Sequence, residues 1–447
     1  MKTTFGERSI ELDVPRERLE VLSESPDLPE LVDLEAAIQR ALANPANSER
    51  LSESVRKGDR ILIIVEDITR PSPVEIMIQA VLKELSKAGV EDQDITFIYA
   101  PGLHKHTFID IEKKFGNEIL DRFRVIDHDS YDPSQNVFLG FTSAGTPIWV
   151  NKAVTESDYI IGIGGVKPNF TPGFGGGCKI VMPGISSCET IQVTHADNHA
   201  SDEPIQCGIP FGPIRKDIDE IGKKAGLKFV LNVVFNRNRE IAQVLAGEPV
   251  QLYREAIDIL MPVWSIGPET LADVAIVCKP GRLRPLVVAY RSTKPGGTIV
   301  VPMGHPVNWA PFLNNGDSLN YVPSREIREG LKNWERDPSI HWPFSIQLLM
   351  NPSFIKYSMG EFVRNALRWG WDIGPFRDIN GVIMLRTVIE LRKIVAVSDS
   401  ADPEITKSLK EYGIDVATTT NEALEMAYKR HGRNARIAVV PPIDDFY

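Results

Sequence analysis

Cysteine is scarce in this sequence, and its spacing is not that of a metal or disulfide site. Only four cysteines occur among 447 residues, at positions 178, 188, 207 and 278. No two of them are spaced as C-x-x-C, so the sequence indicates neither a zinc ribbon nor a disulfide framework. We therefore expect a protein of a reducing compartment, the cytoplasm.

Long apolar runs and blocks of basic residues are also missing. Apolar stretches such as Ile61–Val65 have the length of a strand, and the first residues lack the apolar core of a signal peptide. Lysine and arginine number 50 against 60 aspartates and glutamates, and the formal net charge is −10. We therefore expect neither a membrane nor a nucleic acid as a partner.

The sequence does contain a regular alternation of strand-like and helix-like segments. Its first half predicts strands at Ile61–Val65, Ile95–Tyr99, Tyr159–Ile163 and Lys228–Phe235, and a helix at Val74–Lys87. Such alternation predicts an α/β fold with mainly parallel sheets flanked by helices.

After Trp264 the alternation starts again, with strands predicted at Ala272–Cys278, Thr298–Pro302, Lys393–Ser398 and Arg436–Val440. We therefore predict two domains, at 1–265 and 266–435, with an active site in the cleft between them. A proline-rich and aromatic stretch at 303–345 indicates an insertion or lid, and residues 436–447 are candidates for a return to the first domain.

Polar clusters follow three of the predicted strands. They are Asp67-Ile68-Thr69-Arg70-Pro71, Gly102-Leu103-His104-Lys105-His106, and the segment from Val166 to Lys179. Ligands of open α/β sheets bind beyond the carboxyl ends of the strands. We expect these three loops to line one crevice.

The third loop is rich in glycine and ends in a lysine, reading Gly173-Phe174-Gly175-Gly176-Gly177-Cys178-Lys179. A backbone without Cβ atoms can approach a phosphate or nucleotide closely, although such a loop can equally serve tight geometry alone. Cys178 and Ile180 flank the lysine, which excludes a Walker-type phosphate loop. A dinucleotide fingerprint also fits poorly, since no acidic residue ends the next strand at the expected distance.

Four side chains could carry chemistry. Arg70 could clamp a carboxylate or phosphate, or pair with Asp67, and His104 could act as a general base or hold its own loop. Lys179 could contact a phosphate, become acylated or form an imine when neutral, or remain a solvated lysine. His195 could bind a metal, but one histidine cannot hold a metal ion alone, and the run from Thr194 to His199 is a weak alternative.

Together these segments resemble the nickel-pincer lactate racemase family. The resemblance runs from about residue 55 to about 443 and is most specific in the glycine loop with its lysine and the later histidine. Further matching segments are Pro183-Gly184-Ile185, Thr190-Ile191, Leu231-Asn232-Val233-Val234-Phe235-Asn236 and Lys294-Pro295-Gly296-Gly297-Thr298-Ile299.

The resemblance implies a cofactor, the nickel-pincer nucleotide. This is a pyridinium-3,5-bisthiocarboxylic acid mononucleotide that carries nickel, and the family pattern implies its covalent attachment at Lys179 and His195 as the metal ligand. The cofactor then supplies the donors that one histidine lacks. The remaining cofactor-binding residues implied are Asp67, Ile68, Thr69, Arg70, Gly175, Gly176 and Gly177.

The reaction implied is racemisation or epimerisation of a 2-hydroxy acid, so we expect an isomerase. His104 matches a family base, and Arg70 matches the residue that engages the substrate carboxylate. The partners implied are a small 2-hydroxy acid and the enzymes of cofactor biosynthesis. The sequence leaves the oligomeric state open, and a homo-oligomer is one option.

The sequence departs from the family on the substrate side. Asn169 stands where the family has its second catalytic histidine, and an amide cannot take up a proton at neutral pH. The family's substrate-binding Gln and Lys have no visible counterpart, and Lys167, Arg282 and Arg284 are candidates to replace them. We expect a divergent member whose substrate is not lactate. A one-sided redox enzyme with the same cofactor and a non-enzymatic nucleotide-binding protein are the alternatives.

Overall fold

The computed structural model describes residues 2–443, except 6–7, 13, 105, 170–171, 198–207, 279–282, 303–391, 399–402, 404–405, 407–409 and 411–412. Chain contacts divide these residues into two compact units, each described here by itself. The first unit contains residues 26–263, and the second contains the described residues of 2–25, 264–302 and 392–443. The insertion expected at 303–345 lies outside the described residues.

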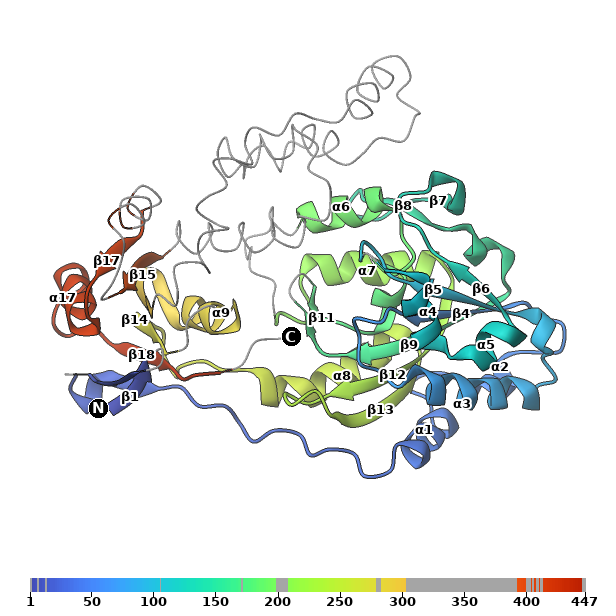
Figure 1. Ribbon diagram of the computed structural model, residues 1–447, viewed down its shortest axis with the longest axis horizontal. Coiled ribbons are helices and arrows are strands. Elements are labelled where there is room, and N and C mark those ends of the chain that lie inside the picture. The colour runs from blue at the N-terminus through green and yellow to red at the C-terminus, as the bar shows by residue number, and fades with distance from the viewer. Residues whose placement is uncertain are drawn as a thin grey trace, which may run out of the picture. The chain divides into compact units, whose positions relative to one another are not determined.

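A six-stranded sheet forms the centre of the first unit, in the order β13-β12-β9-β4-β5-β6 (Figure 1). All neighbouring strands pair in parallel, except that β13 runs antiparallel to β12. The strands are β4 (Ile61–Glu66), β5 (Ile95–Ala100), β6 (Arg124–Asp127), β9 (Tyr159–Val166), β12 (Leu227–Phe235) and β13 (Ile241–Gly247).

Both faces of this sheet are covered, as its apolar sequence requires. Every residue of β4 is buried, and alternate residues face two different cores. One core receives apolar residues from α1 (Leu34–Ala43), α2 (Leu51–Ser54), α3 (Val74–Lys87), α4 (Phe108–Phe115) and α5 (Asn117–Arg122). The other receives them from α6 (Cys188–Asp197), α7 (Pro213–Lys224) and α8 (Pro249–Trp264).

The local sequence explains where these helices begin and end. The helix predicted at Val74–Lys87 is confirmed as α3, and it stops just before Gly89, which has a φ of +79°. Helix α4 begins at Phe108, and its N-cap residue Thr107 forms a capping box with Asp110. The four strands predicted in this unit are present as β4, β5, β9 and β12, each slightly longer than predicted.

The second unit contains another six-stranded sheet, and all of its neighbouring strands are parallel. Its order is β17-β16-β15-β14-β18-β3, with helices α9 (Leu283–Ser292) and α17 (Thr420–His431) packed against it. The strands are β3 (Leu19–Val21), β14 (Ala272–Val277), β15 (Thr293–Pro302), β16 (Lys393–Val397), β17 (Asp415–Ala417) and β18 (Ile437–Val440). The predicted α/β class with mainly parallel sheets is confirmed.

The ends of the chain correct the expected domain limits. Strand β18 does not return to the first domain, because Val439 lies opposite Ile276 of β14 and opposite Val21 of β3. All four residues of β18 are buried, so the strand needs partners on both edges and covers on both faces. Residues 2–25 likewise belong to the second unit, although the sequence analysis assigned them to the first domain.

Three short antiparallel pairs complete the architecture. They are β1 (Lys2–Phe5) with β2 (Arg8–Glu11), β7 (Asn136–Phe141) with β8 (Pro147–Asn151), and β10 (Pro168–Asn169) with β11 (Gly173–Phe174). Within the described part of the chain, none of the helices has the length and apolar composition that a bilayer crossing demands.

The assignment of the first residues to the second unit can be tested at Leu12. This side chain is 1% exposed in the core of the second sheet, so Leu12→Ala should destabilise that unit by about 2–5 kcal/mol. Limited proteolysis mapped by mass spectrometry should then show faster cleavage in 264–443 but not in 26–263. Leu271→Ala, at a position 45% exposed, is the matched control; cleavage first in 26–263 would contradict the assignment.

Candidate active site

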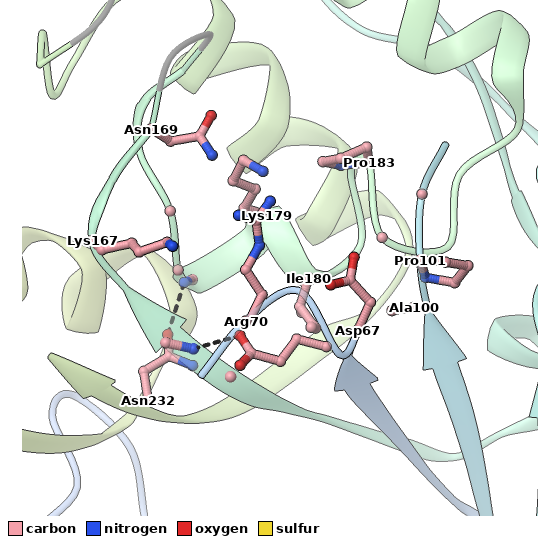
Figure 2. A pocket seen from close by; sticks show the side chains of 18 of the residues that line it. Asp67, Arg70, Ala100, Pro101, Lys167, Asn169, Lys179, Ile180, Pro183 and Asn232 are labelled. Atoms are coloured by element: carbon pink, nitrogen blue, oxygen red, sulfur yellow. Dashed lines mark hydrogen bonds between the residues drawn. The ribbon is translucent and has the colours of Figure 1, made fainter. Parts of the chain in front are cut away.

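One pocket lies at the carboxyl ends of β4, β5 and β9 in the first unit. The three loops expected to share a crevice all contribute to it, together with β12. Side chains from these loops point toward a common space around Lys179 (Figure 2). The residues singled out from the sequence that line it are Asp67, Arg70, His104, Lys167, Asn169, Gly175, Gly176, Gly177 and Lys179.

Asp67 and His104 form a pair at one side of the pocket. His104 Nδ1 lies 2.5 Å from Asp67 Oδ2, while Asp67 Oδ1 accepts hydrogen bonds from the backbone N–H and hydroxyl of Thr69. Burial would raise the pKa of Asp67, but the hydrogen bond and charge of His104, with Arg70 and Thr69, lower this pKa to about 2. A carboxylate that accepts Nδ1–H leaves Nε2 of the imidazole as the basic position.

The loop that carries Arg70 is held from below by a buried lysine of α4. Lys114 Nζ donates to the Arg70 carbonyl at 2.8 Å and lies 3.4 Å from the Glu66 carboxylate. The other oxygen of Glu66 accepts the backbone N–H of Gly165 at 2.8 Å. Among the described residues the Arg70 guanidinium forms no ion pair, so the predicted alternative of a pair with Asp67 is wrong in this structure. The guanidinium faces the pocket.

The glycine loop is tightly packed against the protein beneath it. The Gly177 N–H donates to Asn232 Oδ1 at 2.9 Å, and Arg215 Nη1 donates to the Gly176 carbonyl at 3.0 Å. Gly176 has a φ of +87°, and a Cβ there would lie 2.4 Å from Val166 Cγ2. Glycine is therefore required at position 176 by backbone conformation and packing, whatever ligand the loop holds.

Lys179 lies on a 3-10 turn, Gly177–Ile180, and its side chain enters the pocket (Figure 2). Burial is the largest cause that lowers the pKa of its ammonium, to about 7. The positive charges of Arg70, Arg215 and Lys167 also lower this pKa, whereas the negative charge of Asp67 raises it. The alternative of a solvated lysine at a helix start is therefore wrong in this structure. A fraction of this side chain is a neutral, nucleophilic amine at neutral pH.

Lys167 and Asn169 come from the loop and short strand that follow β9. They lie on one side of Lys179 in Figure 2, and Asp67 lies on the other. Burial, followed by the charge of Arg70, lowers the pKa of Lys167 to about 8. Asn169 is 8% exposed and pairs with Gly173 in the β10–β11 ladder.

Other residues singled out from the sequence are not among those that line this pocket. Ile68 and Thr69 belong to the loop between Asp67 and Arg70, but the pocket lining does not include them. His195 lies on helix α6, but its side chain is outside the described set, as are His199 and Arg282. Arg284 belongs to the second unit, where its guanidinium lies 2.7 Å from Glu24 and stacks over Trp264. The described residues contain no group of three His, Cys, Asp or Glu side chains able to hold a metal ion.

Sequence reasoning assigned no role to the buried polar residues that hold the pocket loops in place. Glu66, Lys114, Arg215 and Asn232 are all buried, polar and bonded to the backbone of the pocket loops. Glu66 and Asn232 could have been noticed as polar residues inside strongly apolar strands, where a buried polar group needs a partner. Lys114 and Arg215 lie on helices, where their sequence context is that of surface residues.

Fold and pocket together define an α/β protein with a glycine-lined pocket, containing Arg70, Lys167 and Lys179, at the end of a mainly parallel sheet. Residues 5–205 match the family described as "Lactate racemase N-terminal domain". A lactate racemase from Lactiplantibacillus plantarum is 27% identical over 417 residues, covering 90% of this chain and 88% of that protein. One from Thermoanaerobacterium thermosaccharolyticum is 26% identical over 310 residues, covering 66% and 72%.

The lactate racemase apoprotein structure from Thermoanaerobacterium thermosaccharolyticum has the same fold. It aligns with a TM-score of 0.63 at 21% sequence identity and covers 100% of this chain and 98% of that one. The resemblance to the lactate racemase family is thereby confirmed.

The packing of the glycine loop predicts different outcomes at neighbouring glycines. Gly176→Ala should lower the stability of the first unit by about 1–2 kcal/mol from the positive φ, with overpacking against Val166 adding about 1–3 kcal/mol. Gly175→Ala is the matched control, because its Cβ would meet no atom closer than 3.4 Å. Urea unfolding midpoints measure both; equal midpoints would refute the packing argument.

The lowered pKa of Lys179 predicts amine reactivity near neutral pH. The rate of acylation by a small anhydride should rise with a midpoint near pH 7 in the folded protein, and near the ordinary value of 10.5 in urea. Arg70→Gln should raise the folded midpoint, because the Arg70 charge disfavours a second cation beside it. Peptide mass spectrometry across a pH series gives the rates, and a folded midpoint near 10 would show that the amine is not perturbed.

Proposed function

We propose that this protein is a racemase or epimerase of a 2-hydroxy acid that uses a nickel-pincer nucleotide attached at Lys179. The observation that carries the proposal is one pocket containing a lysine with a pKa lowered to about 7, the Asp67–His104 pair and the Arg70 guanidinium. The kinship with lactate racemases supports an isomerase of this kind. Cofactor-biosynthesis enzymes would then act on the chain in the cytoplasm.

The pocket has the chemistry that such a group needs. An amine that is neutral near pH 7 can form an amide-type bond, and Arg70 and Lys167 provide positive charge for an anionic nucleotide. The glycine backbone from Gly175 to Gly177 would hold the phosphate, with Asp67 and Arg70 of the same pocket beside it. His195 would be the metal ligand. When bound, the cofactor would supply the site that accepts and returns a hydride.

The residues of the chain would bind the substrate and move its hydroxyl proton. Arg70 would hold the carboxylate through two parallel hydrogen bonds. His104 would take the hydroxyl proton at Nε2, and Asp67 would orient the ring and stabilise its protonated form. Asn169 would donate a hydrogen bond to the substrate but carry no proton.

Lactate is not the substrate that we propose. Asn169 and Lys167 face the pocket, and their amide and ammonium groups would accept a larger and more polar substituent than a methyl group. A sugar acid or another polar 2-hydroxy acid has such a substituent. A second candidate is an enzyme that oxidises or reduces one enantiomer only. Asn169 favours it, because an amide cannot act as a base for the hydroxyl proton on its side of the pocket.

The test uses protein produced together with the cofactor-biosynthesis enzymes. We expect nickel in the preparation, a mass adduct on the peptide containing Lys179, and neither in Lys179→Ala. Chiral chromatography against a panel from lactate to aldonates should show interconversion of both enantiomers of at least one acid. Net conversion of one enantiomer to a 2-oxo acid would favour the second candidate, and full activity without metal or adduct would refute both.

A further inference from the structure

Inversion of a 2-hydroxy acid sets a geometric demand on the pocket, and this inference rests on the proposed function. If the carboxylate stays on Arg70 and the Cα–H bond points the same way for both enantiomers, the hydroxyl and the side chain exchange places. The hydroxyl proton must therefore be handled on two sides of the pocket. A general base must lie within hydrogen-bond reach of the proton it takes.

Most titratable side chains of the pocket either have another role or do not take up a proton near neutral pH. Glu66 is bonded to Gly165 N–H and Lys114, and Asp67 is held as a carboxylate by His104 and Thr69. Arg70 keeps its charge at all relevant pH values, and Lys179 is the proposed attachment point. His104 and Lys167 are the other titratable side chains that line the described pocket.

These two residues come from opposite walls. His104 follows β5 and contacts Asp67, whereas Lys167 follows β9, on the other side of Lys179 from Asp67 (Figure 2). Asn169 lies on the same side as Lys167 and has no proton to exchange at neutral pH. Among the described residues that line the pocket, Lys167 is therefore the one that can carry a proton on the wall opposite His104.

We propose that Lys167 is the second acid–base residue of this pocket. Its neutral amine takes the proton of the substrate 2-hydroxyl when the enantiomer with its hydroxyl on that side is bound. The nitrogen lone pair forms the new N–H bond, and the O–H electron pair stays on oxygen. In the reverse direction the ammonium returns the same proton to the carbonyl oxygen, so that His104 and Lys167 exchange roles with the direction of reaction.

The surroundings of Lys167 suit this role. Burial lowers its pKa to about 8, so both protonation states are accessible near neutral pH. The charged groups around it act in both directions: Arg70 and Arg239 favour the neutral amine, while Glu66 and Asp67 favour the ammonium. Lys167 and Lys179 also disfavour each other's charge.

The first experiment uses the protein without cofactor and needs no activity. Reductive methylation with ¹³C-formaldehyde labels the lysines, and the resonance missing in Lys167→Arg is assigned to Lys167. Its pH titration should have a midpoint near 8. A midpoint near the ordinary value of 10.5 would overturn the proposal.

The second experiment uses the holoprotein and the acid that the wild type racemises. Lys167→Arg keeps the charge but cannot exchange a proton, so its kcat should fall about 100-fold or more, as should that of Lys167→Ala. Methylamine should restore part of the activity of Lys167→Ala, whereas tetramethylammonium, which has no transferable proton, should not. Exposed Lys228→Met is the control expected to match the wild type, and equal nickel content and melting temperature exclude misfolding.

The outcomes separate this proposal from the proposed function. An active wild type together with an active Lys167→Arg would show that position 167 needs only a charge, and would overturn the role of Lys167 alone. Rescue of Lys167→Ala by tetramethylammonium would do the same. A nickel-loaded wild type that interconverts no acid of the panel would overturn the proposed function, and the role of Lys167 with it.

Discussion

Parallel pairing in register of β4, β5 and β9 is the constraint on which the whole pocket depends. Val65 lies opposite both Tyr99 and Ile163, so β4 and β5 end together at Glu66 and Ala100, and β9 continues only as far as Val166. The loops that follow them must then leave the sheet side by side. Residues separated by about a hundred positions in the chain, such as Asp67 and Lys167, share one pocket for this reason alone.

The chemistry of the pocket comes from several charged side chains that lie close together and are partly shielded from solvent. Burial and neighbouring cations lower the pKa values of Lys167 and Lys179, while His104 and Arg70 keep Asp67 ionised. Exposed and alone, each group would titrate in the ordinary range of its type; burial first, and neighbouring cations second, bring the pKa values of the two amines toward neutral pH. Such groups are suited to bond formation and proton transfer rather than to simple ion pairing.

That charge is kept in place by polar side chains buried beneath the loops. Lys114 and Glu66 tie the Arg70 loop to the chain at Gly165, and Asn232 and Arg215 hold the glycine loop at Gly177 and Gly176. A buried polar group without its partner is costly, so these contacts allow few alternative loop positions. The glycine loop is thus rigid because of what lies under it as well as because of its own sequence.

The sequence by itself determined the α/β class, the limits of α3, the central strands β4, β5, β9 and β12, and the loops that meet in the pocket, because apolar periodicity and the glycine, proline and capping residues act locally. The motifs also carried the family resemblance. Tertiary structure alone decided that β3 and β18 join the second sheet, that Arg70 does not pair with Asp67, and that Lys179 is a desolvated amine. Pairing partners, burial and pKa values depend on residues far apart in the chain, and no local pattern contains that information.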